Sequence, residues 1–519
     1  MENETRQPLL LEYIARWGSS QLRKYRVSFS ASVLFGLLAY LFAFTNKLVN
    51  HDEVHCLFSK GATVTSGRWG LGLLDIIFPN YSMPWIYGVI TVFLIALSIC
   101  LIISIFQIRS KLLQVLLAGS IMVFPSLIGT FGYMFTSNSY ALSFLLAVLA
   151  VWFLRHGGTF GPIPALVCMV GSLSIYQSYI AVSASLLVLV LIRQLLKENQ
   201  PVAVIRRGCF FVAFLILSLG LYYLASQIIF RITGTTFSNY AQDSITFSLS
   251  SIPGKILLAY EMFLLFFSEQ KHCLIPSDLS RVAHILIVLV IGVLLVLWAL
   301  RQTGRNGLRF LLLFALVAIL PPAINCMYLI TSAESIHTLV LYGFVAVYIL
   351  AAILIEDSLD VVSGKGHIQI LRKPALNLAT LALSLVIVIN VYVANAAYLN
   401  LHLRYENAYA FYTSLLADLK MMPEFQEDTK LAVTGFWKNP DYFEDNFQFA
   451  HYLAGMYGFV PDSYSNESFL KYYIGVASPF ASAEEIAEIT ASPEYADMAV
   501  YPYYGSVQLF DDVLVVKLS

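Results

Sequence analysis

The chain has 519 residues, of which 58% are hydrophobic and only 12% charged, with a net charge of −1 and a mean hydropathy of +0.73. A soluble domain is about 45–50% apolar and about 25% charged, so this chain has too few charges to cover a soluble surface of its size. The composition therefore excludes a wholly soluble protein and indicates that lipid is the solvent for much of the chain.

Residues 1–27 precede the first apolar run. From Leu9 to Arg26 they mix Leu, Tyr, Ile and Trp with basic residues, which is typical of an amphipathic helix on the cytosolic leaflet. A disordered tail is the alternative. The apolar run that follows is too long for a signal peptide and lacks a small-x-small cleavage site, so it predicts an uncleaved first span.

Residues 28–400 hold the apolar runs long enough to cross a bilayer, which predicts a polytopic domain of about eleven transmembrane helices. The fifth and sixth runs are short, and a helical hairpin or a broken pair is expected there. A further run at 256–267 is too short to span and predicts an interfacial or re-entrant helix. The eleven predicted spans are 28–48, 84–106, 112–130, 139–154, 163–179, 181–196, 208–230, 283–300, 309–330, 336–355 and 376–399.

Lys and Arg predict the direction of the chain. With the N-terminus inside, every cytosolic loop carries basic charge, from the Arg109–Lys111 loop to the loop around Arg372. An odd number of spans then leaves the C-terminus outside. The protein is thus expected in the cytoplasmic (inner) membrane of a bacterium, with its N-terminus in and its C-terminus out.

Residues 401–519 differ in composition from the rest. From Asn400 onward there are 17 acidic and 6 basic residues, and the apolar runs become short. The runs 430–436 and 513–517 predict strands, and 482–489 predicts a helix with Ser482 as N-cap and Glu485 completing a capping box. We expect a small extracytoplasmic α+β domain, whose acidity argues against a nucleic-acid partner.

The first outer loop contains the residues best suited to chemistry. Asp52 and Glu53 follow the first span directly, and carboxylates at a membrane boundary are costly to desolvate. Either could act as general base toward a hydroxyl. Arg68 could hold a phosphate in a bidentate grip, and Trp69 offers a face for a sugar ring. The alternatives are a solvated loop start and an Arg-Trp interfacial anchor.

Other outer segments are polar and aromatic, or basic. Tyr133, Asn138, Tyr176 and Gln177 are candidates to line a sugar pocket, although aromatic residues are also common in the membrane-interface belt. Arg231 and Lys271 could neutralise a leaving phosphate or be ordinary surface charges. The cysteines show no metal-ligand spacing, so no structural metal site is predicted.

Several short motifs together resemble one family. They are the acidic pair after the first span, Gly67-Arg68-Trp69-Gly70, Ser174-Ile175-Tyr176-Gln177-Ser178, and the tail Tyr501-Pro502-Tyr503-Tyr504-Gly505-Ser506 followed by 513–518. These features resemble the bacterial glucosyl transferase II type of membrane glucosyltransferases, which glucosylate O-antigen and other cell-surface glycans. The resemblance covers most of the chain.

The resemblance implies a GT-C fold, a hexose donor (glucose in this family) carried on polyprenyl phosphate, and an essential acidic residue in the first outer loop. That role falls on Asp52 or Glu53, and the sequence His-Asp-Glu in place of two aspartates leaves open which residue is the base. The expected reaction is a single displacement that inverts the anomeric carbon. A divalent metal is an open alternative, since paired carboxylates and phosphate suit one.

The expected acceptor is a polysaccharide, a lipopolysaccharide or a teichoic-acid-like glycan, and a donor synthase and a small flippase are expected partners. Two other functions fit the same residues less well. A flippase for lipid-linked sugars should show polar residues on both membrane faces, whereas the carboxylates here gather in one outer loop. A non-catalytic assembly or sensor protein would use the acidic outer domain to bind a partner.

Overall fold

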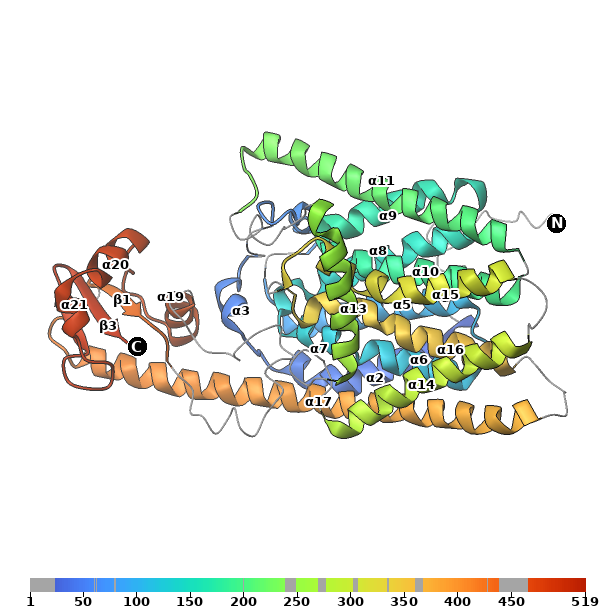
Figure 1. Cartoon of the computed structure of the whole chain (residues 1–519). Coiled ribbons are helices and arrows are strands. Elements are labelled where there is room, and N and C mark those ends of the chain that lie inside the picture. Colours follow the sequence, from blue (N-terminus) through green and yellow to red (C-terminus); the bar gives the residue numbers. More distant parts are fainter. Residues whose placement is uncertain are drawn as a thin grey trace, which may run out of the picture.

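The structure is a computed structural model that describes residues 24–59, 61, 63–78, 81–198, 200–238, 249–268, 277–301, 307–333, 336–359, 367–426, 428–437 and 465–519. Long helices run side by side in a bundle, and a small C-terminal domain lies beyond one end of it (Figure 1). The predicted amphipathic segment 9–26 falls almost wholly outside the described residues.

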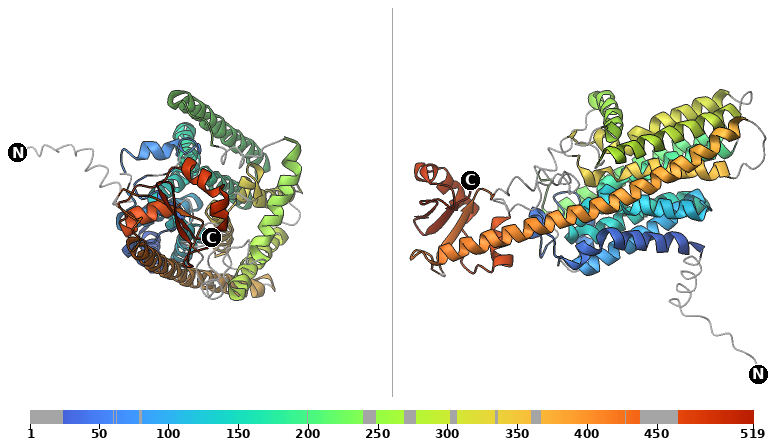
Figure 2. Two further views of the ribbon diagram at one scale, coloured as in Figure 1. Left: turned by 90° about the vertical axis from the view of Figure 1, so that its left-hand side faces the viewer. Right: turned by 90° about the horizontal axis from the view of Figure 1, so that it is seen from below.

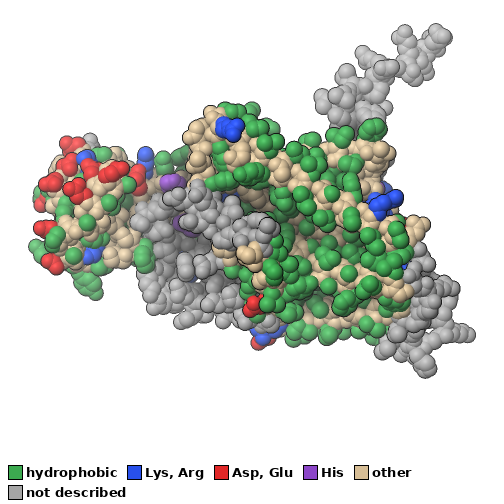
Figure 3. All heavy atoms as spheres, turned by 45° about the horizontal axis from the view of Figure 1, so that its top comes forward, with side chains coloured by type: hydrophobic (Ala, Val, Ile, Leu, Met, Phe, Trp, Pro, Cys, Tyr) green, Lys and Arg blue, Asp and Glu red, His purple; other side chains and the backbone are tan. Residues whose placement is uncertain are grey.

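Ten helices in the described residues are long and apolar enough to cross a membrane, and a bent pair makes up to eleven. This confirms the predicted span count. Hydrophobic side chains cover much of the outer surface of the bundle, where lipid would surround it (Figure 3). The spanning helices are α2 (Arg26–Thr45), α5 (Pro84–Phe106), α8 (Met134–His156), α9 (Pro162–Ile175), α10 (Ile180–Lys197), α11 (Pro201–Thr233), α14 (Asp278–Arg301), α15 (Gly307–Ile324), α16 (Val345–Leu359) and α17 (His367–Lys420).

The predicted third span is the bent pair, α6 (Lys111–Met122) and α7 (Pro125–Phe131), whose axes differ by 47°. Pro125 explains the break, because proline has no backbone N–H to donate and disfavours a helical residue before it. Phe124 accordingly has an extended backbone, with ψ of 138°. The short fifth and sixth runs are two separate spans divided at Tyr176, which is also extended.

The interior of the bundle is formed by α10 and α16. In their most apolar stretches 89% and 100% of the residues are buried, whereas in α11 only 17% are. Hence α11 lies at the periphery. Helix α13 (Ile252–Ser268) runs crosswise to the spanning helices at one end of the bundle (Figure 2), where the sequence predicted an interfacial or re-entrant helix at 256–267.

Helix α17 continues without a break through position 400, where a boundary between membrane and outer domains was predicted. At 1.5 Å per residue, its 54 residues extend for about 80 Å, more than twice the thickness of the hydrocarbon core. It runs along the bundle and reaches the C-terminal domain (Figure 1). One continuous helix therefore joins the two parts of the protein.

The C-terminal domain holds a three-stranded sheet in the order β1-β3-β2, with β1 (Lys430–Thr434) parallel and β2 (Val507–Phe510) antiparallel to β3 (Val513–Lys517). Both predicted strands are confirmed, and β2 is the strand that the sequence did not reveal. The predicted Ser482–Glu485 capping box opens α20 (Ala483–Thr490). Acidic side chains gather on the surface of this domain (Figure 3).

Candidate functional site

The loop after the first span begins with the five-residue helix α3 (His51–His55), which lies between the bundle and the C-terminal domain (Figure 1). Asn50 is its N-cap: the side-chain oxygen accepts a 2.7 Å hydrogen bond from the backbone N–H of Glu53. The Asn50 amide nitrogen donates to the carbonyl of Gly132 at 2.5 Å. This side chain therefore fixes both the start of α3 and its position against the segment between α7 and α8.

Glu53 is wholly buried, and both of its carboxylate oxygens have partners. One oxygen accepts hydrogen bonds from the Lys47 ammonium and the Ser82 hydroxyl. The other accepts from the backbone N–H of Phe135 at 3.1 Å, and Lys47 also donates to Ser82 at 2.6 Å. Glu53 thus joins the end of α2, the residues before α5 and the first turn of α8.

Asp52 has a different environment from its neighbour. Its side chain is 35% exposed and lies beside the His51 ring, with Nε2 3.7 Å from Oδ1. Adjacent residues on a helix point in different directions, which explains why one carboxylate is buried and the other accessible. Of the two predicted bases, Asp52 is the one that an acceptor could reach without displacing a buried ion pair.

The Gly67–Gly70 segment packs too closely against neighbouring helices for other residues to replace its glycines. Gly67 has φ of +70°, and a Cβ there would lie 2.6 Å from the Tyr222 hydroxyl on α11. A Cβ on Gly70 would lie 2.3 Å from Oγ of Ser174 near the end of α9. Glycine at both positions therefore lets helix α4 (Trp69–Leu74) approach α9 and α11.

Arg68 lies between the two glycines and contacts two tyrosines from the bundle. Its Nη1 donates to the Tyr140 hydroxyl at 3.1 Å, and its guanidinium carbon lies 5.3 Å from the centre of the Tyr176 ring. The two tyrosine rings stack on each other with centroids 4.2 Å apart. The guanidinium is held by a hydrogen bond and a cation–π contact, both of which fix its orientation.

Gln177 connects the segment between α9 and α10 directly to the Gly67–Gly70 segment. Its amide nitrogen donates to the carbonyl of Ser66 at 3.1 Å and to the Tyr222 hydroxyl at 2.9 Å. Tyr222 in turn donates to the carbonyl of Gly67 at 2.8 Å. Residues about 110 positions apart in the sequence therefore form one network around the backbone that carries Arg68.

A cavity of about 320 Å³ opens beside this network. Its polar lining includes residues of the 66–68 and 176–178 segments. The rest is mainly apolar side chains of α9, α10, α11 and the 327–340 segment. The lining comprises Ser66, Arg68, Leu173, Tyr176, Gln177, Ser178, Ile180, Leu219, Tyr222, Tyr223, Phe237, Met327, Ile330, Thr331, Ile336, His337 and Val340.

Not every predicted site residue lines this cavity. Trp69 donates its indole N–H to Ser226 at 3.1 Å, and Tyr133 packs near Phe135. Asn138 is fully buried, and its amide nitrogen has no hydrogen-bond partner in the described part of the chain. Arg231 is exposed on the last turn of α11. Lys271 lies outside the described residues.

Two side chains of the site were not among the predicted candidates. Tyr222 stands inside a long apolar run, where nothing in the local pattern separates it from its neighbour Tyr223. Lys47 follows the first apolar run, and its pairing with Glu53 depends on how the chain folds back after α2. The described residues contain no group of three His, Cys, Asp or Glu arranged to hold a metal ion.

The C-terminal domain also contacts the loop after the first span. Helix α19 (Asn466–Phe469) packs against α3, and the Tyr472 ring meets the Phe58 ring edge-on at 5.0 Å. Burial, followed by the nearby negative charge of Glu53, raises the pKa of Tyr473 above its ordinary value. Residues far beyond the bundle therefore cover one side of the loop that carries Asp52 and Glu53.

These features define a multi-pass membrane protein with a candidate active site at the end of the bundle that faces the C-terminal domain. A family model described as glucosyl transferase GtrII matches residues 41–350, which is more than half of the chain. The protein belongs to this family and is a membrane glucosyltransferase. No curated protein and no solved structure matches the chain. The match includes α3, Arg68 and the cavity lining, and ends before the C-terminal domain.

Proposed function

We propose that the protein transfers glucose from a polyprenyl-phosphate donor to a cell-surface glycan on the extracytoplasmic face of the membrane. The cavity beside Arg68 carries this proposal. Its lining is mainly apolar, and Arg68 is the one Lys or Arg among the described residues that line it. An apolar cavity with one fixed cation suits a ligand that joins an isoprenoid chain to a phosphate.

Arg68 is the proposed phosphate ligand. A guanidinium group offers parallel N–H donors that match two phosphate oxygens, and the contacts with Tyr140 and Tyr176 hold it in one orientation before the donor binds. The same charge stabilises the phosphate as it leaves the sugar. We also propose Arg231 and Lys271 as secondary phosphate ligands, and Trp69, Tyr133 and Asn138 as sugar contacts. Their residue types and their positions in the sequence support these roles.

Asp52 is the proposed general base. Its carboxylate accepts the proton of the acceptor hydroxyl while that oxygen bonds to the anomeric carbon of glucose. The bond from that carbon to the donor phosphate breaks, the electron pair leaves with polyprenyl phosphate, and the configuration inverts. The exposure of Asp52 supports this assignment, whereas the full set of partners around Glu53 supports a role in positioning the loop.

Transfer in liposomes tests the function. Purified protein is mixed with polyprenyl-phosphate glucose and candidate glycan acceptors, and glucosylated acceptor and released polyprenyl phosphate are quantified. Equal amounts of both products are expected. If the protein instead moves the donor across the bilayer and never consumes it, the protein is a flippase and the proposal fails.

Substitution of Arg68 tests the phosphate contact. With Arg68→Gln we expect the KM for the donor to rise on the order of tenfold to a hundredfold, because a charge-assisted hydrogen bond is worth about 1.5–3 kcal/mol. Arg68→Lys should recover only part of the loss, since a single ammonium cannot replace a planar fork. Arg281→Gln is the matched control, because this arginine of the same bundle end pairs with Asp278 and does not line the cavity. An unchanged KM for Arg68→Gln would remove Arg68 from the donor site.

The proposed orientation places the C-terminal domain outside the cytoplasm. Tyr504 is fully exposed on this domain, so Tyr504→Cys should react with a membrane-impermeant maleimide on intact cells. Background from Cys56 should be low, because burial and then the charge of Asp52 raise the pKa of its thiol to about 12. Labelling of Tyr504→Cys only after lysis would reverse the orientation and remove the basis for a lipid-linked donor.

A further inference from the structure

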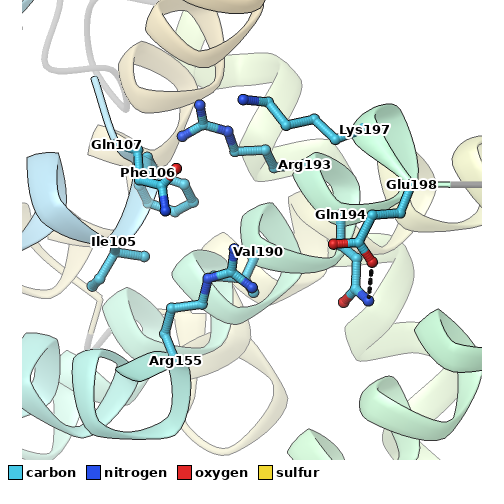
Figure 4. Close-up of a pocket in the computed structure, with 9 residues that line it drawn as sticks. All are labelled: Ile105, Phe106, Gln107, Arg155, Val190, Arg193, Gln194, Lys197 and Glu198. Carbon is cyan, nitrogen blue, oxygen red and sulfur yellow. Dashed lines mark hydrogen bonds between the residues drawn. The ribbon is translucent and has the colours of Figure 1, made fainter. Parts of the chain in front are cut away.

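A second pocket lies at the opposite end of the bundle, remote from the C-terminal domain and from the candidate active site. Helices α5, α8 and α10 end around it, and its polar lining is Gln107, Arg155, Arg193, Gln194, Lys197 and Glu198 (Figure 4). We propose that this pocket binds a phosphate group, either that of an anionic lipid headgroup or a free phosphate ion.

The charges around the pocket do not balance. Oδ1 of Asp357 on α16 lies 3.2 Å from both Arg193 Nη2 and Lys197 Nζ, so one carboxylate oxygen is shared by two cations. Glu198 accepts a 2.9 Å hydrogen bond from the Gln194 amide. With Arg155 the pocket has three cations, and in the described part of the chain only Oδ1 of Asp357 lies within ion-pair distance of any of them.

The neighbouring Glu356 adds negative charge near Arg193 but makes no ion pair with the cations of the pocket in the described residues. Its two oxygens accept hydrogen bonds from the backbone N–H groups of Arg109 and Ser110, at 2.9 and 3.1 Å. These amides are at the N-terminus of α6, where the helix dipole favours a negative charge. Glu356 is therefore engaged by the helix end and is not directed to the guanidinium groups of the pocket.

Hydrogen-bond donors without acceptors are the second reason to expect an anion in this pocket. Arg193 is only 7% exposed, and its Nη1 is buried without a hydrogen-bond partner in the described residues, as is Oδ2 of Asp357. Arg155 makes no ion pair or hydrogen bond within the same part of the chain, and its side chain extends into the pocket (Figure 4). A buried guanidinium nitrogen without an acceptor is costly, so an acceptor from outside the protein would be bound favourably.

Basic residues at this end also have a simpler explanation. Lys and Arg are favoured near helix C-termini and in cytosolic loops. Those preferences account for the presence of positive charge, but they do not account for a guanidinium nitrogen buried without an acceptor. Basic pockets between transmembrane helices are a known form of headgroup site for anionic lipids, which favours the lipid as the source of the phosphate.

The size of the pocket limits the ligand. Its volume is about 30 Å³, enough for about two or three water-sized groups such as the outer oxygens of a phosphate, and too small for a sugar ring or a nucleotide. An acyl chain would remain outside the pocket, between the helix ends. A phosphodiester headgroup would bring one negative charge to a lining that holds Arg155, Arg193 and Lys197 against Glu198 alone.

Native mass spectrometry of the purified full-length protein tests the site. Phosphatidylglycerol, phosphatidylcholine and inorganic phosphate are titrated separately. We expect phosphatidylglycerol to bind, with affinity reduced on the order of tenfold by Arg155→Gln, because one charge-assisted contact is lost. Arg155 has no described ion-pair partner, so its replacement strands no carboxylate, and Arg155→Lys should retain part of the affinity.

Arg206→Gln is the matched control, because Arg206 is an exposed arginine near the same end of the bundle and does not line the pocket. Its affinity for phosphatidylglycerol should equal that of the unaltered protein. Equal losses of phosphatidylglycerol affinity in Arg155→Gln and Arg206→Gln would mean general attraction to a basic surface and would overturn the proposal. It would also be overturned if phosphatidylcholine bound as tightly as phosphatidylglycerol and inorganic phosphate did not bind. Displacement of the lipid by inorganic phosphate at equal concentration would assign the site to the free ion.

Discussion

Asp52→Asn is expected to abolish most glucosyl transfer, with a fall in kcat of about a hundredfold to ten-thousandfold. An amide cannot accept the proton that the acceptor hydroxyl must lose, whereas its size and polarity are close to those of the carboxylate. The KM for the lipid donor should change little, because the proposed phosphate contact is made by Arg68 and not by Asp52. The measurement is initial-rate transfer in liposomes at several donor concentrations.

Asp278→Asn is the matched control for this experiment. Asp278 is 86% exposed in the first turn of α14, which begins at the same end of the bundle, and it does not line the cavity. This variant should keep full activity and an unchanged thermal midpoint. Full transfer by Asp52→Asn would show that another group is the base, and a lowered midpoint for that variant would mean that the loss of rate reports misfolding.

Lys47→Met is expected to lower the stability of the protein by about 3–5 kcal/mol, the usual result of removing one partner from a buried ion pair. Glu53 would then remain fully buried with only the Ser82 hydroxyl and the Phe135 amide to compensate its charge. The measurement is unfolding of the purified protein in detergent, followed by intrinsic fluorescence. Since Lys47 is 26% exposed, the effect should lie toward the lower end of this range.

The double variant Lys47→Met/Glu53→Gln separates charge from packing. Replacing the stranded carboxylate by a neutral amide should recover a large part of the lost stability, because no uncompensated charge remains. Lys420→Met, at an exposed lysine of α17, should leave stability unchanged. If the double variant is no more stable than Lys47→Met alone, the stability lost in Lys47→Met does not come from leaving the Glu53 charge without its Lys47 partner.

The different roles of Asp52 and Glu53 could not be predicted from the sequence, where they are equivalent neighbours after an apolar span. Their difference depends on Lys47, Ser82 and Phe135, which meet Glu53 only when three helices are packed together. The same holds for Tyr222, whose hydroxyl meets Gln177 and Gly67 across a helix interface. Contacts between distant segments leave no local pattern in the chain.

The features that the sequence predicted well are those with local physical causes. Span count follows from runs of apolar residues about as long as the bilayer is thick, and the Ser482–Glu485 capping box needs only four consecutive residues. The break before Pro125 has an equally local cause, although the apolar run there was read as one straight span. The continuous helix α17 was not foreseen, because the change in composition near Asn400 marks where the solvent changes and not where the helix ends.

The sequence by itself determined that this chain crosses a membrane many times, has an acidic C-terminal part and has motifs of a glucosyltransferase family. Hydropathy, capping and short motifs are properties of neighbouring residues, so they can be read before the chain folds. The tertiary structure alone decided that Arg68, Tyr176 and Gln177 share one cavity, that Glu53 is buried in an ion pair, and that Arg155 and Arg193 line a pocket at the other end. Burial and pairing depend on which helices pack together, and side chains far apart in sequence then determine the environment of each charge.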